Sequence, residues 1–212
     1  ELNSETDFAS KDSNFLAFGE KVKNYISENK ITEPLAFLDT EIEEERKSLV
    51  QTIGENIQLR RVETIDFNND MQIGSYLHSD SKLGAIVSIN GGNEQVAKDI
   101  AMHVAAFNPL CLSKDNISID ILEREKAIFE NQAKDSGKTE EIMEKMIEGK
   151  IKRFLSEVSL LSQSFVKDSE ITIEEYLASN GASILAFARL KVGEGIEVQT
   201  KDFAEEVAEQ LK

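Results

Sequence analysis

The sequence predicts an α+β fold, with antiparallel sheets and packed helices in a two-part core, a projecting antiparallel helical hairpin and a C-terminal helix. The apolar residues switch repeatedly between a helical period and a period of two. Helical and strand segments are also intermixed without the regular alternation of a doubly wound α/β sheet. The chain of 212 residues is long enough for one large domain or two small ones.

Residues 1–66 are predicted to form the N-terminal half of the core, and its first elements are helices. Asp12 or Ser13 can cap the first helix. A second strongly helical stretch covers residues 41–53 and ends at Gly54, a natural helix stop. The apolar residues that recur at helical spacing in the first helix are Phe15, Phe18, Val22, Tyr25 and Ile26.

Shorter elements complete this half. Thr32 is expected to cap a short unit that has Pro34 in its first turn. The apolar period then changes to two, which predicts a strand over residues 57–65 with an irregularity at Arg60 and Arg61.

The C-terminal half of the core is predicted to combine residues 67–113 with residues 160–198. Residues 73–78 and 83–89 have the pattern of a β-hairpin, and Asn93 opens an apolar helix. Further along, a capping box at Thr172 and Glu175 predicts a short helix, which is followed by a strand over 183–192 and a glycine turn at 193–195.

Two helical modules are predicted outside this core. Residues 114–159 contain two amphipathic segments joined at 136–138, which is typical of an antiparallel coiled-coil hairpin that projects from the body. Residues 199–212 are predicted to form a last helix, capped by Thr200, in which Phe203 shares a face with later apolar residues.

The composition excludes several classes of function. No apolar run approaches the ~20 residues that span a bilayer, so we expect no membrane segment. The net charge of −16 repels phosphate backbones and makes direct nucleic-acid binding a poor expectation. This acidic charge fits a protein partner with a basic face, or it serves only to keep the protein soluble. No signal peptide is visible and Cys111, the single cysteine, forms no internal disulfide, which fits the cytoplasm.

No residue pattern predicts catalysis, a metal site or a bound cofactor. The glycine pairs lack the spacing of a phosphate loop. His78 is expected in an exposed hairpin turn, His103 inside the core, and Cys111 in an inert apolar setting. The absence of such a pattern favours a protein that acts by binding.

Thr6, Asp7 and Phe8 place an aromatic ring beside a carboxylate in a polar segment. Phe8 either probes another protein or folds back beneath the following helix. Residues 1–11 resemble the signature of the elongation factor Ts family, in which an aliphatic–Asn segment precedes Thr-Asp-Phe-Val and a basic residue. Ala9 departs from it, since Val is usual there. Further blocks in the family's order are residues 53–57, 60–62, 74–78, 101–109, 148–157 and 193–197.

The resemblance implies a guanine-nucleotide exchange factor that binds the GDP complex of elongation factor Tu, displaces Mg²⁺ and releases GDP. By the same resemblance, Thr6, Asp7, Phe8 and Ala9 form the Mg²⁺-displacing element. The other partner contacts implied are Ile53, Gly54, His78 and Phe203. Two chains are also implied to meet through the second half of the core.

Family members carry a small helical domain before this motif, so we expect weaker binding and slower exchange from a chain that begins at Glu1. The alternatives are an acidic interaction module or scaffold without exchange activity and a hydrolase with scattered carboxylates. The lack of an ordered catalytic site disfavours the hydrolase.

Overall fold

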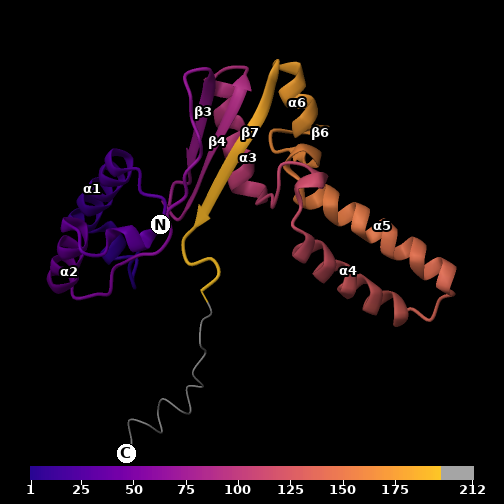
Figure 1. Cartoon of the computed structure of the whole chain (residues 1–212), viewed down its shortest axis with the longest axis horizontal. Helices are drawn as coiled ribbons and strands as arrows, with labels where there is room; N and C mark the ends of the chain where they lie inside the picture. Colours follow the sequence, from indigo (N-terminus) through magenta and orange to yellow (C-terminus); the bar gives the residue numbers. More distant parts are fainter. Residues whose placement is uncertain (197–212) are drawn as a thin grey trace, which may run out of the picture.

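The computed structural model describes residues 1–196 and confirms the α+β class. Figure 1 shows helices α1 and α2 at one end of the molecule, a three-stranded sheet in the middle and a helical hairpin at the other end. The buried apolar residues form two separate clusters, one among residues 15–57 and one among residues 85–177. The predicted helix over 199–212, with Phe203, lies outside the described residues.

The first cluster is built between α1 (Ser13–Asn29) and α2 (Glu41–Ile53). The side chain of Asp12 accepts a hydrogen bond from the backbone N–H of Asn14 and caps α1, as predicted. Gly54 ends α2 in the left-handed conformation with φ 80°, which glycine adopts without strain. The short 3₁₀ helix Pro34–Phe37 starts after Glu33 instead of Thr32, so the predicted cap was wrong.

The predicted strand over 57–65 is wrong for most of its length. Only Gln58–Leu59 (β2) is a strand, and it pairs antiparallel with Leu2–Asn3 (β1). The chain leaves the strand at Arg60 and Arg61 because their side chains bind distant groups. Their guanidinium groups donate to the backbone carbonyls of Glu194 and Lys191, each at 2.6 Å.

The second cluster lies between a sheet in the order β3-β4-β7 and helix α3 (Glu94–Phe107). The three antiparallel strands are Met71–Leu77, Leu83–Gly91 and Ala182–Lys191, close to their predicted bounds. Asn93 caps α3 by accepting a hydrogen bond from Val96 N–H, also as predicted.

A small unpredicted hairpin precedes the last short helix. Its strands are β5 (Ser164–Phe165) and β6 (Asp168–Thr172), and both are too short and polar to show a clear period. Helix α6 (Ile173–Ser179) follows, with the predicted capping box between Thr172 and Glu175. Phe165 of the hairpin and Ile173 and Leu177 of the helix belong to the second cluster.

Helices α4 (Ile119–Lys134) and α5 (Glu140–Val158) form the predicted antiparallel hairpin, which Figure 1 shows extending away from the sheet. Ala133 is the one fully buried residue on the two helices, so the hairpin has a thin seam instead of a core. Phe129 and Phe154 meet edge to face across this seam, with ring centroids 6.4 Å apart.

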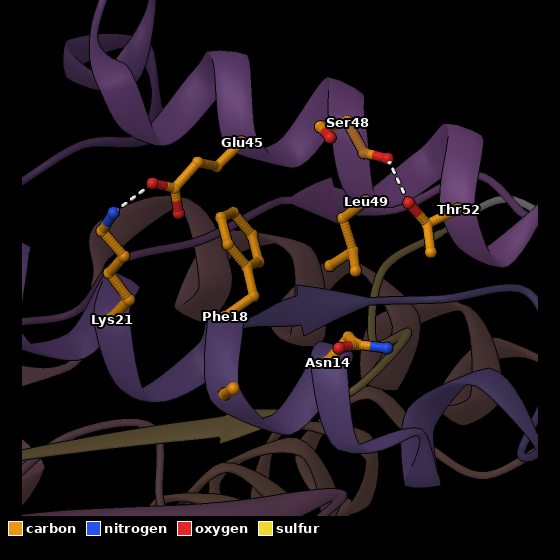
Figure 2. A pocket seen from close by; sticks show the side chains of 8 residues that line it. Asn14, Phe18, Lys21, Glu45, Ser48, Leu49 and Thr52 are labelled. Carbon is orange, nitrogen blue, oxygen red and sulfur yellow. Dashed lines mark hydrogen bonds and ion pairs between the residues drawn. The ribbon is translucent and has the colours of Figure 1, made fainter.

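A shallow groove of about 320 Å³ runs between α1 and α2 (Figure 2). Phe18 and Leu49 contribute its apolar surface, and the ion pair of Lys21 with Glu45 crosses one end. None of the predicted partner-binding residues that the structure describes lines this groove.

Candidate functional site: an exposed aromatic turn

The side chain of Phe8 points into solvent with 89% of its surface exposed, while its neighbour Ala9 is buried. Ala9 begins a single 3₁₀ turn, Ala9–Lys11, just before α1. The backbone N–H groups of Ser10 and Lys11 donate to the carbonyls of Thr6 and Phe8, each at 3.2 Å. Phe8 is therefore an exposed ring on an ordered turn, and the alternative in which it folds beneath the helix was wrong.

Thr6 fixes the turn to the end of α2. Its backbone N–H donates to Glu55 Oε2 at 3.0 Å and its hydroxyl donates to Glu55 Oε1 at 2.6 Å. Both carboxylate oxygens of Glu55 are thus used by one residue. We call residues 6–11 the aromatic turn. Since Glu55 directly follows Gly54, this turn and the Ile53–Gly54 corner lie next to each other.

Asp7 fixes the turn on its other side, against the loop between β3 and β4. Lys82 Nζ donates to Asp7 Oδ1 at 2.6 Å, and this hydrogen bond lowers the pKa of the Asp7 carboxyl. In the same loop His78 Nδ1 lies 2.9 Å from Asp80 Oδ1. His78 is exposed, as the sequence predicted for a turn histidine.

An open cleft of about 930 Å³ lies between the aromatic turn and the β3–β4 loop. Its polar lining comes from the serines and charged groups of both segments, and Leu16 and Val192 add apolar surface. Of the predicted partner-binding residues, Thr6 and Asp7 line this cleft. Phe8, Ala9 and His78 do not line it but belong to the same two segments.

The other titratable candidates belong to the core. His103 is fully buried; its Nδ1 accepts from Val166 N–H at 3.2 Å and its Nε2 lies 3.0 Å from Gln163 Oε1. Burial lowers the pKa of His103, so the neutral ring donates through Nε2. Cys111 is buried beside Ser159 Oγ at 3.4 Å. Both residues have the structural roles that the sequence predicted.

Asp99 is a buried carboxylate with a complete set of donors. Lys167 Nζ and Gln95 Nε2 each donate at 2.7 Å, and Tyr176 Oη donates at 3.0 Å. Burial alone would raise the pKa of Asp99, but these hydrogen bonds bring it below its usual value. Burial and the bond to Asp99 raise the pKa of Tyr176 to about 12. The network joins α3 to α6.

Within residues 1–196, no group of three or more His, Cys, Asp or Glu is placed to hold a metal ion. None of the helices in this part of the chain is long and apolar enough to cross a membrane.

The family model described as elongation factor TS matches residues 5–194. The chain belongs to the elongation factor Ts family. A protein named elongation factor Ts from Hahella chejuensis (strain KCTC 2396) is 44% identical over 212 residues, which is 100% of this chain and 73% of that protein. The elongation factor Ts of Psychrobacter arcticus is 47% identical over 98% of this chain and 71% of that protein. That of Francisella tularensis subsp. novicida is 47% identical over 100% of this chain and 74% of that protein.

Membership of the elongation factor Ts family makes this chain a translation elongation factor. Two residues of the candidate site were missed by sequence reasoning. Glu55 and Lys82 contact Thr6 and Asp7 across 49 and 75 positions of the chain. Glu55 lies in a block that resembles the family, but no local pattern says which distant group its carboxylate binds.

Proposed function

We propose that the chain is a guanine-nucleotide exchange factor for elongation factor Tu in the cytoplasm. It would bind the GDP complex, disturb the Mg²⁺ site of that partner and let GTP replace GDP. The observation that carries the proposal is the exposed Phe8 ring on an ordered turn. A ring held in solvent is suited to insertion between elements of another protein.

The proposed mechanism uses binding free energy without making or breaking a covalent bond. Burying one Phe side chain contributes about 1.5–3 kcal/mol, equal to about one to two decades in affinity. Nucleotide and exchange factor each weaken the binding of the other to the same partner, and this coupling is reciprocal. Contacts that the factor makes only when the partner holds GDP weakly therefore speed the release of GDP. Mg²⁺ demands near-ideal octahedral geometry, and a small displacement of its supporting helix weakens nucleotide binding.

Phe8 does not act alone in this proposal. Ile53 and Gly54 would meet the same domain of the partner, and His78 would meet a second domain. Gly54 lies exposed at the end of α2, and a Cβ there would have no neighbour among residues 1–196 within 4 Å. This open surface supports a close approach by the partner's backbone. Phe203 lies outside the described residues, and its contact with the partner stays a prediction.

The test is stopped-flow release of fluorescent GDP from elongation factor Tu. The Phe8→Ala variant is expected to lower the second-order rate constant by about 10- to 100-fold. Phe67→Ala is the matched control, because Phe67 is 60% exposed and lies outside the site. An unchanged rate for Phe8→Ala contradicts the mechanism. Binding of the unaltered chain without faster release would favour an acidic interaction module.

We also propose that two copies meet through the second half of the core. The sheet face opposite α3 carries an apolar pocket of about 310 Å³, partly lined by Leu77, Ile86 and Leu190. Leu77, at the edge of this pocket, is 66% exposed. In a two-fold dimer its side chain can enter the same pocket of the second copy.

Sedimentation velocity over a range of concentrations tests this dimer. Leu77→Glu is expected to shift the chain to monomer, because a carboxylate would be desolvated in the contact. Leu35→Glu is the control, as Leu35 is 69% exposed in the first half. A monomeric unaltered chain at every concentration excludes the dimer.

A further inference from the structure

We propose that Glu55 is a positioning residue that holds the Phe8 ring ready for insertion, by fixing the turn that carries it to the end of α2. The inference rests on the proposed exchange function and extends it to a residue outside the exposed ring. It follows from a chain of hydrogen bonds that begins at the Glu55 carboxylate.

Thr6 is at the centre of these hydrogen bonds. Its hydroxyl donates to Glu55 Oε1 at 2.6 Å and accepts from Ala9 N–H at 3.3 Å. Its carbonyl accepts from Ser10 N–H at 3.2 Å and from Ser4 Oγ at 3.1 Å. Glu55 therefore reaches the backbone on the C-terminal side of Phe8 through one intermediate residue, while Thr6 itself lies on the N-terminal side.

Glu55 is better suited to this role than the other contact of the turn. Both contacts are solvent-exposed, but Glu55 receives two hydrogen bonds from Thr6, and one of them comes from the backbone N–H of the turn itself. The Asp7–Lys82 ion pair makes one hydrogen bond between side chains that are 66% and 50% exposed. Water and salt screen such a pair, so its contribution is small.

Fixing the turn matters because an exposed side chain on a loose loop loses entropy when a partner orders it. The Phe8 ring itself contacts little of its own chain, being 89% exposed. Its direction is set by the backbone of residues 6–11 and hence by Thr6. Glu55 follows Gly54 directly, so the end of α2 is the fixed point to which the turn is held.

A double-mutant cycle tests the proposal in the GDP-release assay. Glu55→Ala is expected to lower the second-order rate constant about tenfold, which corresponds to about 1.4 kcal/mol. In the Phe8→Ala background the same change is expected to have no further effect, because Glu55 acts only through the ring. Additive losses in the double variant overturn the inference. Glu28→Ala, an exposed carboxylate at the end of α1, is the matched control.

Amide hydrogen exchange gives a second readout that needs no partner. Glu55→Ala is expected to speed exchange at the N–H groups of Thr6, Ala9 and Ser10 and leave those of α1 unchanged. If hydrogen exchange at the turn is unchanged in Glu55→Ala, the inference is overturned, even where the unaltered chain speeds GDP release from elongation factor Tu. If the unaltered chain and Phe8→Ala speed GDP release from the partner equally, the proposed role of Phe8 fails. If neither of them speeds it, the exchange function fails. In both cases the hydrogen-exchange result still decides whether Glu55 fixes the turn.

Discussion

At the scale of single residues, the structure separates polar groups that stabilise the core from those that face a partner. His103 has both ring nitrogens engaged in the interior, whereas His78 lies in an exposed loop with its ring beside the carboxylate of Asp80. Sequence context predicted this difference correctly, because one histidine lies in an apolar helix and the other in a hairpin turn. The partners of each could not be predicted, since Gln163 is 60 positions from His103.

His103 should make the stability depend on pH. Its folded pKa is lowered by burial, so the unfolded chain binds a proton near pH 6.5 that the folded chain resists. Stability is then lost as the pH falls below about 6.5, by up to about 1.4 kcal/mol per pH unit until the folded pKa is reached. Urea unfolding at several pH values should show a shallower dependence for His103→Gln. Equal slopes for the two proteins would contradict this.

At the scale of elements, α3 lies directly against β3 at one glycine. A Cβ on Gly74 would lie 2.1 Å from both the carbonyl carbon and the carbonyl oxygen of Ala97. No side chain fits between these two backbones, so the glycine sets the distance between the helix and the sheet.

Gly74→Ala should therefore force α3 away from the sheet. We expect a loss of about 3 kcal/mol in the free energy of unfolding, at the upper end for overpacking a core. Gly84→Ala on the neighbouring strand is the control, because its Cβ would lie 3.6 Å from the nearest atom, Leu77 Cδ1. Thermal unfolding of both variants measures the difference, and equal midpoints would refute the explanation.

The elements that the sequence predicted well are those whose pattern is long and local. The helices α1, α2 and α3 have apolar faces of several turns and recognisable ends, and their bounds were close. The strand over 57–65 failed because Arg60 and Arg61 bind groups more than 125 positions away. In the candidate site, the family resemblance singled out Phe8. Glu55 could be identified only from its contact with Thr6 in the folded structure. The proposed boundaries at 66, 113 and 159 stay predictions.

At the scale of the whole molecule, a polar junction connects the two halves of the core. The Glu1 side chain is fully buried and accepts from Arg60 at 3.1 Å, from Arg61 and from Gly193 N–H at 2.9 Å. Burial would raise the pKa of Glu1, but these donors lower it overall. A single carboxylate therefore joins the start of the chain, the segment after β2 and the turn after β7.

Glu1→Gln should loosen this junction. We expect a loss of about 2 kcal/mol, as for hydrogen bonds that lose their charged partner. A carboxylate whose pKa is lowered by folding contributes its full stabilisation above the pKa of the unfolded state. This stabilisation is lost as the pH falls through the pKa of the folded state. Thermal unfolding at neutral and acid pH should thus show a difference between the variant and the unaltered chain that shrinks in acid. Glu33→Gln, on an exposed loop, is the control.

The buried position of Cys111 has a practical consequence for the study of this molecule. It is the single cysteine in these 212 residues and is only 6% exposed. A cysteine introduced on the surface, for example Lys138→Cys in the exposed turn at the end of the helical hairpin, would be the accessible thiol for a maleimide dye. The native thiol need not be removed first, so distances from the hairpin to a labelled partner can be followed with the interior unchanged.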